Sequence, residues 1–271
     1  MQALIAQIRD NAAVVVQDVW DEIEHSDFKP RYFELNFSRK GDIAPYTWET
    51  NGLEFALRGK IDRVDTCGDK LKVVDYKTGS KKYSLSDILR GKNLQPFIYM
   101  LMLKKAQLGE NCAALFLPAK AEYIDSDEAL DDGRIAKKRT ESVRRLGLVR
   151  GERDILESLE HGAGSGKARW LPVSLRRDGS LDPKKSSIAL KDQMDRIIAY
   201  TEEKLTEFSR LVSSGEVDIS PCGEDACKYC AFYSACFAED IPECAGGLDT
   251  NSTETVLAVI NGEEGQSNGE V

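Results

Sequence analysis

The sequence lacks any long apolar run that could span a bilayer, and it lacks the features of a secretory signal. Its N-terminus, MQALIAQIRDNAAVVVQDVW, has no basic segment followed by an apolar core and a cleavage site, and it has the spacing of an amphipathic helix. These absences predict a cytoplasmic protein with no membrane partner. The 271 residues, 41% of them hydrophobic and 31% charged, suit one large globular domain or a domain with an appendage.

Basic residues are absent from residues 238–271, which contain eight Asp and Glu residues. The net charge of the whole chain is −9, so the remaining body is close to neutral, near −1. Because the negative net charge comes mainly from this C-terminal segment, it does not exclude a nucleic-acid partner. Residues 134–153 are distinctly basic, and they form either a solvated helical face or a phosphate-binding patch.

Cysteine is concentrated near the C-terminal end, and the total of seven is odd. An odd number in a chain without a secretory signal argues against a disulfide framework. Cys227, Cys230 and Cys236 form the pattern C-x2-C-x5-C, and Cys222 lies five positions earlier. Because four thiolates can close a zinc or a 4Fe–4S site, the spacing predicts a metal staple without choosing between the two.

The hydrophobic periodicity predicts an α/β protein with a small mixed β-sheet flanked by helices. Helical spacing of apolar residues covers residues 1–24, 94–108 and 184–212. Strand patterns cover residues 31–38, 53–64, 69–79 and 113–119, with a hairpin at a short Thr-Cys-Gly turn between the second and third. The polar segment 125–170 predicts a short helix beside a loop. We expect a core over 1–215, a cysteine-rich segment over 216–240 and an acidic tail over 241–271, disordered except for one short apolar run.

Two carboxylates and a lysine stand in the predicted hairpin, GKIDRVDTCGDKLKVVDYKTG. Residues two apart share one face of a strand, so Asp75 and Lys77 project to the same side. Asp62 lies on the polar face of the partner strand, and the hairpin can bring Asp62 close to Asp75. Two close carboxylates repel unless a cation separates them, and Mg²⁺ prefers oxygen ligands. The pattern predicts a Mg²⁺ site at Asp62 and Asp75, beside which Lys77 would assist a water molecule or neutralise charge on a phosphoryl group. The alternative is that Asp62 and Asp75 are ordinary aspartates on an exposed strand face.

The full string, G-x-x-D-R-x-D followed by D-Y-K-T-G, resembles the RecB-like branch of the PD-(D/E)-x-K nucleases, which have a restriction-endonuclease-like core. The resemblance implies that Asp62 and the D-Y-K pair bind metal and assist attack of water on a DNA phosphodiester. It extends to Gln95 and Tyr99, which match a Q-x-x-x-Y helix motif, and to Glu34, which either approaches the metal or supports the site. The upstream histidine of this family has no counterpart, because His25 lacks the glycine context and has the position of a helix-end residue.

The cysteine spacing resembles the iron–sulfur staple of AddB-type nuclease domains. This resemblance implies a 4Fe–4S cluster on Cys227, Cys230 and Cys236, with the fourth ligand upstream of the chain or, failing that, Cys222. Segments 144–160, 170–187 and 214–221 resemble the same family, so the resemblance covers about residues 28–240. It implies that the chain is the C-terminal piece of a longer bacterial helicase–nuclease subunit with an AddA-like partner subunit.

The leading interpretation is a Mg²⁺-dependent DNA exonuclease domain that acts on single-stranded ends during recombinational repair of double-strand breaks. ATP would be hydrolysed by helicase motors, since this chain has no Walker A motif. A free-standing nuclease of the CRISPR-adaptation type is a second interpretation, and a non-catalytic, metal-stapled DNA-binding module is a third. We expect contacts with the DNA backbone from Lys60, Arg63 and residues 134–153.

Overall fold

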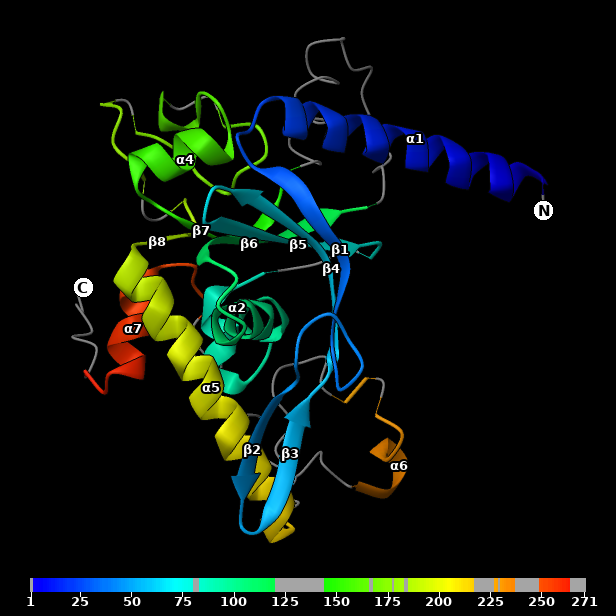
Figure 1. The fold of residues 1–271 in the computed structure, drawn as a ribbon, viewed down its shortest axis with the longest axis vertical. Helices are drawn as coiled ribbons and strands as arrows, with labels where there is room; N and C mark the ends of the chain where they lie inside the picture. The colour runs from blue at the N-terminus through cyan, green and yellow to red at the C-terminus, as the bar shows by residue number, and fades with distance from the viewer. Residues whose placement is uncertain are drawn as a thin grey trace.

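A six-stranded mixed sheet with helices on both faces forms the centre of the computed structural model (Figure 1). The residues it describes are 2–79, 83–119, 144–165, 168–176, 178–182, 185–216, 227–228, 230–236 and 249–263. Across the sheet the strands are β1 (Lys29–Phe37), β4 (Gly59–Cys67), β5 (Lys70–Lys77), β6 (Glu110–Pro118), β7 (Leu146–Arg150) and β8 (Ile188–Ala189). The pairs β5–β6 and β7–β8 are parallel and the other pairs are antiparallel, which confirms the predicted α/β class with a mixed sheet.

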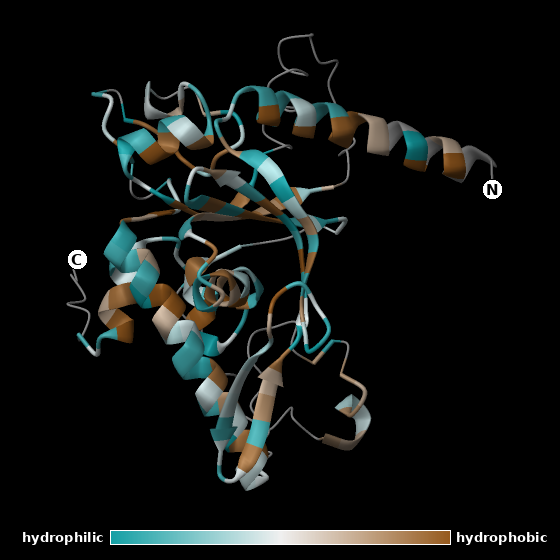
Figure 2. Cartoon of the chain, in the orientation of Figure 1, coloured by the Kyte–Doolittle hydropathy of each residue, from teal (hydrophilic) through white to brown (hydrophobic). Residues whose placement is uncertain are grey.

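One face of the sheet is covered by α2 (Gln95–Lys105), α5 (Lys191–Ser214), α7 (Thr253–Ile260) and the 3-10 helix η1 (Leu85–Arg90). Apolar ribbon segments concentrate where these helices meet the sheet (Figure 2). Pro96 occupies the first turn of α2, where its missing N–H costs nothing. The left-handed φ of 72° at Gly215 ends α5, which begins at Lys191 and not near residue 184 as predicted.

The opposite face of the sheet carries α1 (Gln2–Glu24) and α4 (Arg153–Leu159) with the short η2 (Ala163–Ser165) (Figure 1). The C-terminal half of α1 lies on the sheet, whereas its N-terminal half extends away from the body (Figure 1). Asp18 and Glu22, one helical turn apart, are buried residues by which α1 meets the strands. The contact between α1 and the sheet is therefore largely ionic.

Six charged side chains form a buried charge cluster between α1 and the sheet. Its members are Asp18, Glu22, Arg63, Asp65, Lys72 and Arg145, each at most 8% exposed. The Lys72 Nζ lies 3.1 Å from Glu22 and 2.9 Å from Asp65, and Arg145 bonds both α1 carboxylates at 2.6 and 2.8 Å. Three positive and three negative groups leave the cluster neutral, which is the condition under which such burial is tolerated.

Two of the expected strand boundaries are wrong. Residues 53–64 do not form one strand, because the chain breaks at Arg58 between β3 (Leu53–Leu57) and β4. β3 pairs with β2 (Tyr46–Thr50) in a separate two-stranded ribbon, which packs on α5 through a hydrogen bond from Trp48 Nε1 to Ser209 Oγ. The hairpin turn is at Gly68 and Asp69 rather than at Thr-Cys-Gly, since β4 continues through Cys67.

Two predicted loop segments contain regular structure. The expected helix-and-loop region 125–170 includes β7 as well as α4, while residues 120–143 lie outside the described part. Within the predicted tail 241–271, residues 249–263 are described and include α7, whose Val256 is fully buried in the core. α7 contains the short apolar run that the prediction set apart from the rest of the tail. Among the described residues, no helix is both long and apolar enough to cross a membrane.

Candidate active site

Three acidic residues lie in one row across β1, β4 and β5. The register pairs Phe33 with Arg63 and Leu35 with Ile61, which places Glu34 opposite Asp62. The β4–β5 register, in which Arg63 faces Val74, places Asp62 opposite Asp75 by the same count. Asp75 is only 2% exposed and shares its alternation with Val73, which packs in the core cluster that includes α2. The structure thus brings together the carboxylates that the sequence predicted.

The row lies at a fork, which we define as the point where β4 and β5 separate beyond the Arg63–Val74 pair. Arg63 and Val74 are the last residues paired between these strands, whereas β5 stays paired with β6 as far as Lys77 and Pro118. The Tyr76 backbone N–H donates instead to Asp62 Oδ2 at 2.9 Å. A carboxylate therefore replaces a ladder carbonyl, and Asp62 is held beside β5.

A chain of hydrogen bonds leads from Asp75 to α2. Lys77 Nζ lies 2.5 Å from Asp75 Oδ2 and donates to Gln95 Oε1 at 3.0 Å. Gln95 Nε2 in turn donates to the Tyr99 hydroxyl at 2.6 Å. Gln95 and Tyr99 share a helix face, as expected for residues four apart, and that face looks onto the row. The D-x-K strand and the Q-x-x-x-Y helix thus form one site.

The environment of Tyr99 shows that negative charge converges here. Burial raises the pKa of the Tyr99 phenol, and Asp75, Asp62 and Glu34 raise it further against the hydrogen bond from Gln95. Oxygen ligands and concentrated negative charge fit a hard divalent cation such as Mg²⁺. Within the described residues, no three His, Cys, Asp or Glu side chains are already grouped as a metal site. The fit therefore rests on the chemistry of the donor set.

Glu34 is the least constrained member of the row. Its side chain is 65% exposed and pairs with Lys60 at 3.1 Å. The backbone at Glu34 has a φ of 51°, which is uncommon for a residue other than glycine and is found mostly where the surrounding structure enforces it. A carboxylate in this setting can turn toward the row or remain with Lys60, so both predicted roles of Glu34 are compatible with the structure.

The remaining predicted site residues lie elsewhere. His25 directly follows α1, and its Nδ1 contacts the Asp21 carbonyl oxygen at 2.8 Å, as expected for a helix-end histidine. Cys227 and Cys230 form a turn through a 3.1 Å backbone hydrogen bond, and Cys236 ends the short α6 (Tyr233–Cys236). Cys222 lies outside the described residues. The metal staple therefore remains a prediction.

The expected DNA contact through Arg63 is wrong, because this side chain is 1% exposed and belongs to the buried charge cluster. The same correction applies to part of the basic stretch 134–153. Arg145 and Arg150 are 1% and 7% exposed and are paired with acidic residues. Half of that stretch, residues 134–143, lies outside the described residues. The buried arginines stabilise the fold and cannot reach a phosphate.

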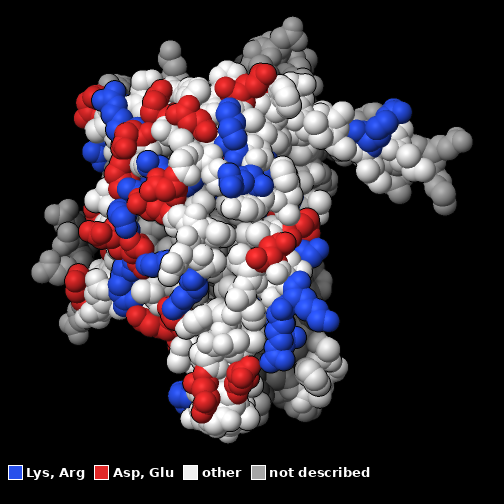
Figure 3. All heavy atoms as spheres, in the orientation of Figure 1, with Lys and Arg blue, Asp and Glu red and all other residues white. Residues whose placement is uncertain are grey.

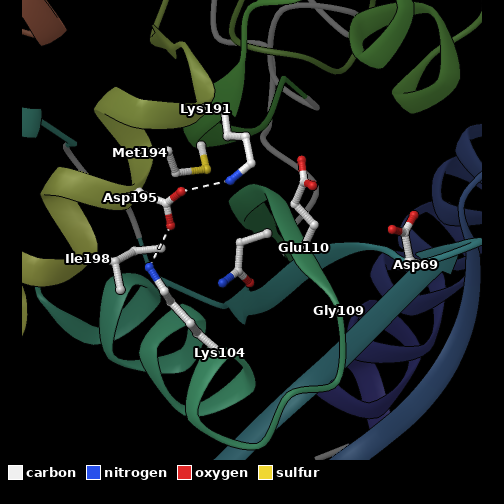
Figure 4. Close-up of a pocket in the computed structure, with 9 residues that line it drawn as sticks. Asp69, Lys104, Gly109, Glu110, Lys191, Met194, Asp195 and Ile198 are labelled. Carbon is white, nitrogen blue, oxygen red and sulfur yellow. Dashed lines mark hydrogen bonds and ion pairs between the residues drawn. The ribbon is translucent and has the colours of Figure 1, made fainter.

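A pocket of about 340 Å³ opens at the other end of the hairpin. It is lined by Asp69 and by residues of α2 and α5, and both Lys104 and Lys191 point to Asp195 within it (Figure 4). Asp69 is about 20 Å from Asp75 along β5. Lys104, Lys191 and Asp195 are therefore paired with one another, and the pocket is separate from the acidic row.

Two contributions to this site are not among the residues predicted from the sequence. The Tyr76 amide holds Asp62, and the buried charge cluster lies directly behind the fork. The sequence contained a signal for the cluster. Arg63 and Asp65 lie on the same face of β4, and Lys72, which pairs with Asp65, lies on that face of β5. Charged residues on both faces of a central strand indicate that the second face also packs against polar groups.

The PD-(D/E)XK nuclease superfamily model matches residues 2–237, and the chain belongs to this superfamily. Its members generally use a divalent metal, in agreement with the acidic row. Curated relatives named as the B subunit of an ATP-dependent helicase/deoxyribonuclease include one from Clostridium botulinum, 28% identical over 240 residues, and one from Acetivibrio thermocellus, 29% identical over 242 residues. These alignments cover 82% of this chain but only 21% of each relative, so the chain spans about a fifth of their length.

Proposed function

We propose that the chain is the nuclease domain of an AddB-type subunit of an ATP-dependent helicase–nuclease. The row of Glu34, Asp62 and Asp75 beside Lys77 is the observation that carries this proposal. It is supported by the superfamily match and by relatives whose printed name joins a helicase to a deoxyribonuclease. The substrate would be single-stranded DNA ends from unwound duplex in double-strand-break repair. The partner would be an AddA-like subunit in the bacterial cytoplasm.

Mg²⁺ would be held by Asp62 and Asp75, where it would supply Lewis acidity toward a phosphodiester oxygen. Lys77, fixed between Asp75 and Gln95, would neutralise charge that develops on the phosphoryl group. Tyr99 and Gln95 would keep the lysine aimed at the row. The protein thus contributes a positive group next to its metal ligands, which is an arrangement suited to hydrolysis of an anionic diester.

Cleavage of single-stranded DNA by the full-length subunit with its partner tests the proposal. We expect activity in Mg²⁺ that disappears on chelation and returns when Mg²⁺ is added again. A variant of the partner subunit without its own nuclease activity removes that background. Retained DNA binding without any cleavage would instead support the non-catalytic module, and full activity without the partner would support a free-standing nuclease.

An exposed basic surface next to the row is suited to the DNA backbone. Arg39 and Lys40 lie in the loop after β1, which folds back because Asp42 bonds the Asn36 backbone. Phe37 pairs with Gly59, so this loop is adjacent to exposed Arg58. Lys and Arg side chains gather over this region (Figure 3). It lies about 10 Å from Glu34 along β1, close enough for the same strand to reach both.

Replacing Arg58 with alanine is expected to weaken binding of single-stranded DNA, with the largest loss at low salt. One lost phosphate contact should lower the slope of log affinity against log salt by about 0.7. Fluorescence anisotropy at several salt concentrations measures that slope. Lys185→Ala is the matched control, because Lys185 is exposed beside the far edge of the sheet. Equal slopes for the two variants would contradict the assignment.

The cysteine-rich segment would hold a 4Fe–4S cluster rather than zinc, a proposal that the resemblance to AddB-type domains supports. Purified under anaerobic conditions, the full-length subunit is expected to show iron and a visible absorbance band. Cys230→Ala should lose both, whereas Cys222→Ala should keep them if the fourth ligand lies upstream. Stoichiometric zinc without iron would contradict the cluster, and loss of iron in Cys222→Ala would make Cys222 the fourth ligand.

A further inference from the structure

A hydrogen bond crosses the fork on the face opposite to the acidic row. Arg63 Nη1, on β4, donates to the Tyr76 hydroxyl, on β5, at 2.8 Å, and the guanidinium lies 5.7 Å from the Tyr76 ring centroid. Arg63 belongs to the last residue pair of the ladder, and Tyr76 lies two positions beyond Val74. The bond therefore joins the two strands just past the point at which their backbone hydrogen bonds end.

The same tyrosine contacts the acidic row through its backbone. Its N–H donates to Asp62 Oδ2, so Tyr76 receives a hydrogen bond from Arg63 on its side chain and gives one to Asp62 from its backbone. Asp62 opposes Asp75, which directly precedes Tyr76. Any change in the position of Tyr76 therefore alters the separation of the two carboxylates.

Arg63 is itself held rigidly. Its Nε and Nη2 make a two-point contact with Asp65 at 2.8 and 3.0 Å, and Glu22 of α1 lies 3.9 Å away. Burial opposes its charge, but Asp65 and Glu22 raise the pKa of Arg63 above its ordinary value, so it stays protonated. A fixed, charged donor of this kind is a suitable anchor for a neighbouring strand.

We propose that Arg63 and Tyr76 are positioning residues, which fix Asp62 relative to Asp75 by clamping β5 to β4 behind the fork. The inference rests on the proposed function in one respect, because its expected consequence is metal binding by the two carboxylates. The clamp itself is a property of the metal-free chain. The buried charge cluster therefore stabilises α1 and, through Arg63, also sets the geometry of the site.

Tyr76→Phe tests the clamp, because it removes the hydroxyl but retains the ring. Tyr200→Phe is the matched control: it removes the hydroxyl of a half-buried tyrosine on α5 that donates to the Leu89 carbonyl oxygen, away from the fork. Two measurements are made on the full-length subunit. The first is hydrogen exchange of the segment containing the Tyr76 amide without metal, and the second is Mn²⁺ affinity without DNA.

For Tyr76→Phe we expect amide exchange about tenfold faster, as for the loss of one hydrogen bond, and Mn²⁺ affinity about 10- to 100-fold weaker. Tyr200→Phe should change neither. Unchanged exchange in Tyr76→Phe, or equal acceleration in both variants, would overturn the clamp. Faster exchange with unchanged Mn²⁺ affinity would overturn the positioning role and leave the nuclease proposal standing. Absence of Mn²⁺ binding in the wild type would instead refute the metal site, while exchange would still report on the clamp.

Discussion

Replacing Asp75 with asparagine in the full-length subunit is expected to lower DNA cleavage by about 10³-fold while the protein remains folded. Asparagine has nearly the same shape, so the buried position stays filled, but the negative charge that would hold Mg²⁺ is lost. Lys77 would also lose its 2.5 Å ion pair and with it one of its two fixed partners. The initial rate of release of labelled nucleotides from single-stranded DNA gives the size of the effect.

Asp69→Asn is the matched control for this experiment. Asp69 is an exposed aspartate in the turn of the same hairpin, about 20 Å from the row. Its replacement should leave the cleavage rate within about twofold of wild type, because surface changes away from the site have small effects. If Asp75→Asn cut DNA as fast as Asp69→Asn, the acidic row would not be the catalytic site.

Replacing Glu22 with alanine is expected to lower the free energy of unfolding by about 3–5 kcal/mol. The substitution leaves Lys72 and Arg145 buried without one of their carboxylate partners, and burial of an uncompensated charge is costly. Urea unfolding at pH 7, followed by circular dichroism, measures the change. Glu24→Ala is the control, since Glu24 is exposed on the same helix, where it accepts a hydrogen bond from Trp20.

The pH dependence of stability gives a second test of the same residue. Burial alone would raise the pKa of Glu22, but Lys72, Arg145 and Arg63 hold it well below its ordinary value of 4.5. A depressed folded-state pKa means that the stabilisation is complete above pH 4.5 and is lost as the pH falls below it. Glu22→Ala should therefore lose less stability than wild type between pH 5 and about pH 3. Parallel curves would show that Glu22 is not the titrating group.

The acidic row could be predicted from the sequence because alternation along a strand is a local property. Asp75 and Lys77 share a face whatever their neighbours do, and the helical spacing of Gln95 and Tyr99 is equally local. Whether Asp62 lies opposite Asp75 depends on the register of the hairpin. A two-residue turn at Gly68 and Asp69 places the two aspartates opposite each other, whereas a turn at Thr-Cys-Gly would place Asp62 opposite Lys72.

The parts that could not be predicted depend on contacts between distant segments. Nothing near Arg63 in the sequence shows that Glu22 will neutralise it, so Arg63 resembled a surface cation. The short β7 has only five residues, and burial against β6 rather than its own pattern makes it a strand. Similarly, α7 has eight residues, a length that is not stable alone, and it forms because Val256 packs into the core.

The buried charge cluster also has a consequence for the order of events during synthesis. Glu22 and Arg145 are 123 residues apart, and Trp170, which donates to Asp18, follows it by 152. At about 5–20 residues per second, a ribosome would need roughly 6–25 s to add Arg145 after Glu22. Throughout that interval the carboxylates of α1 would be without their final partners. We therefore expect α1 to dock completely only after Arg145 and Trp170 have been made, well after its own synthesis.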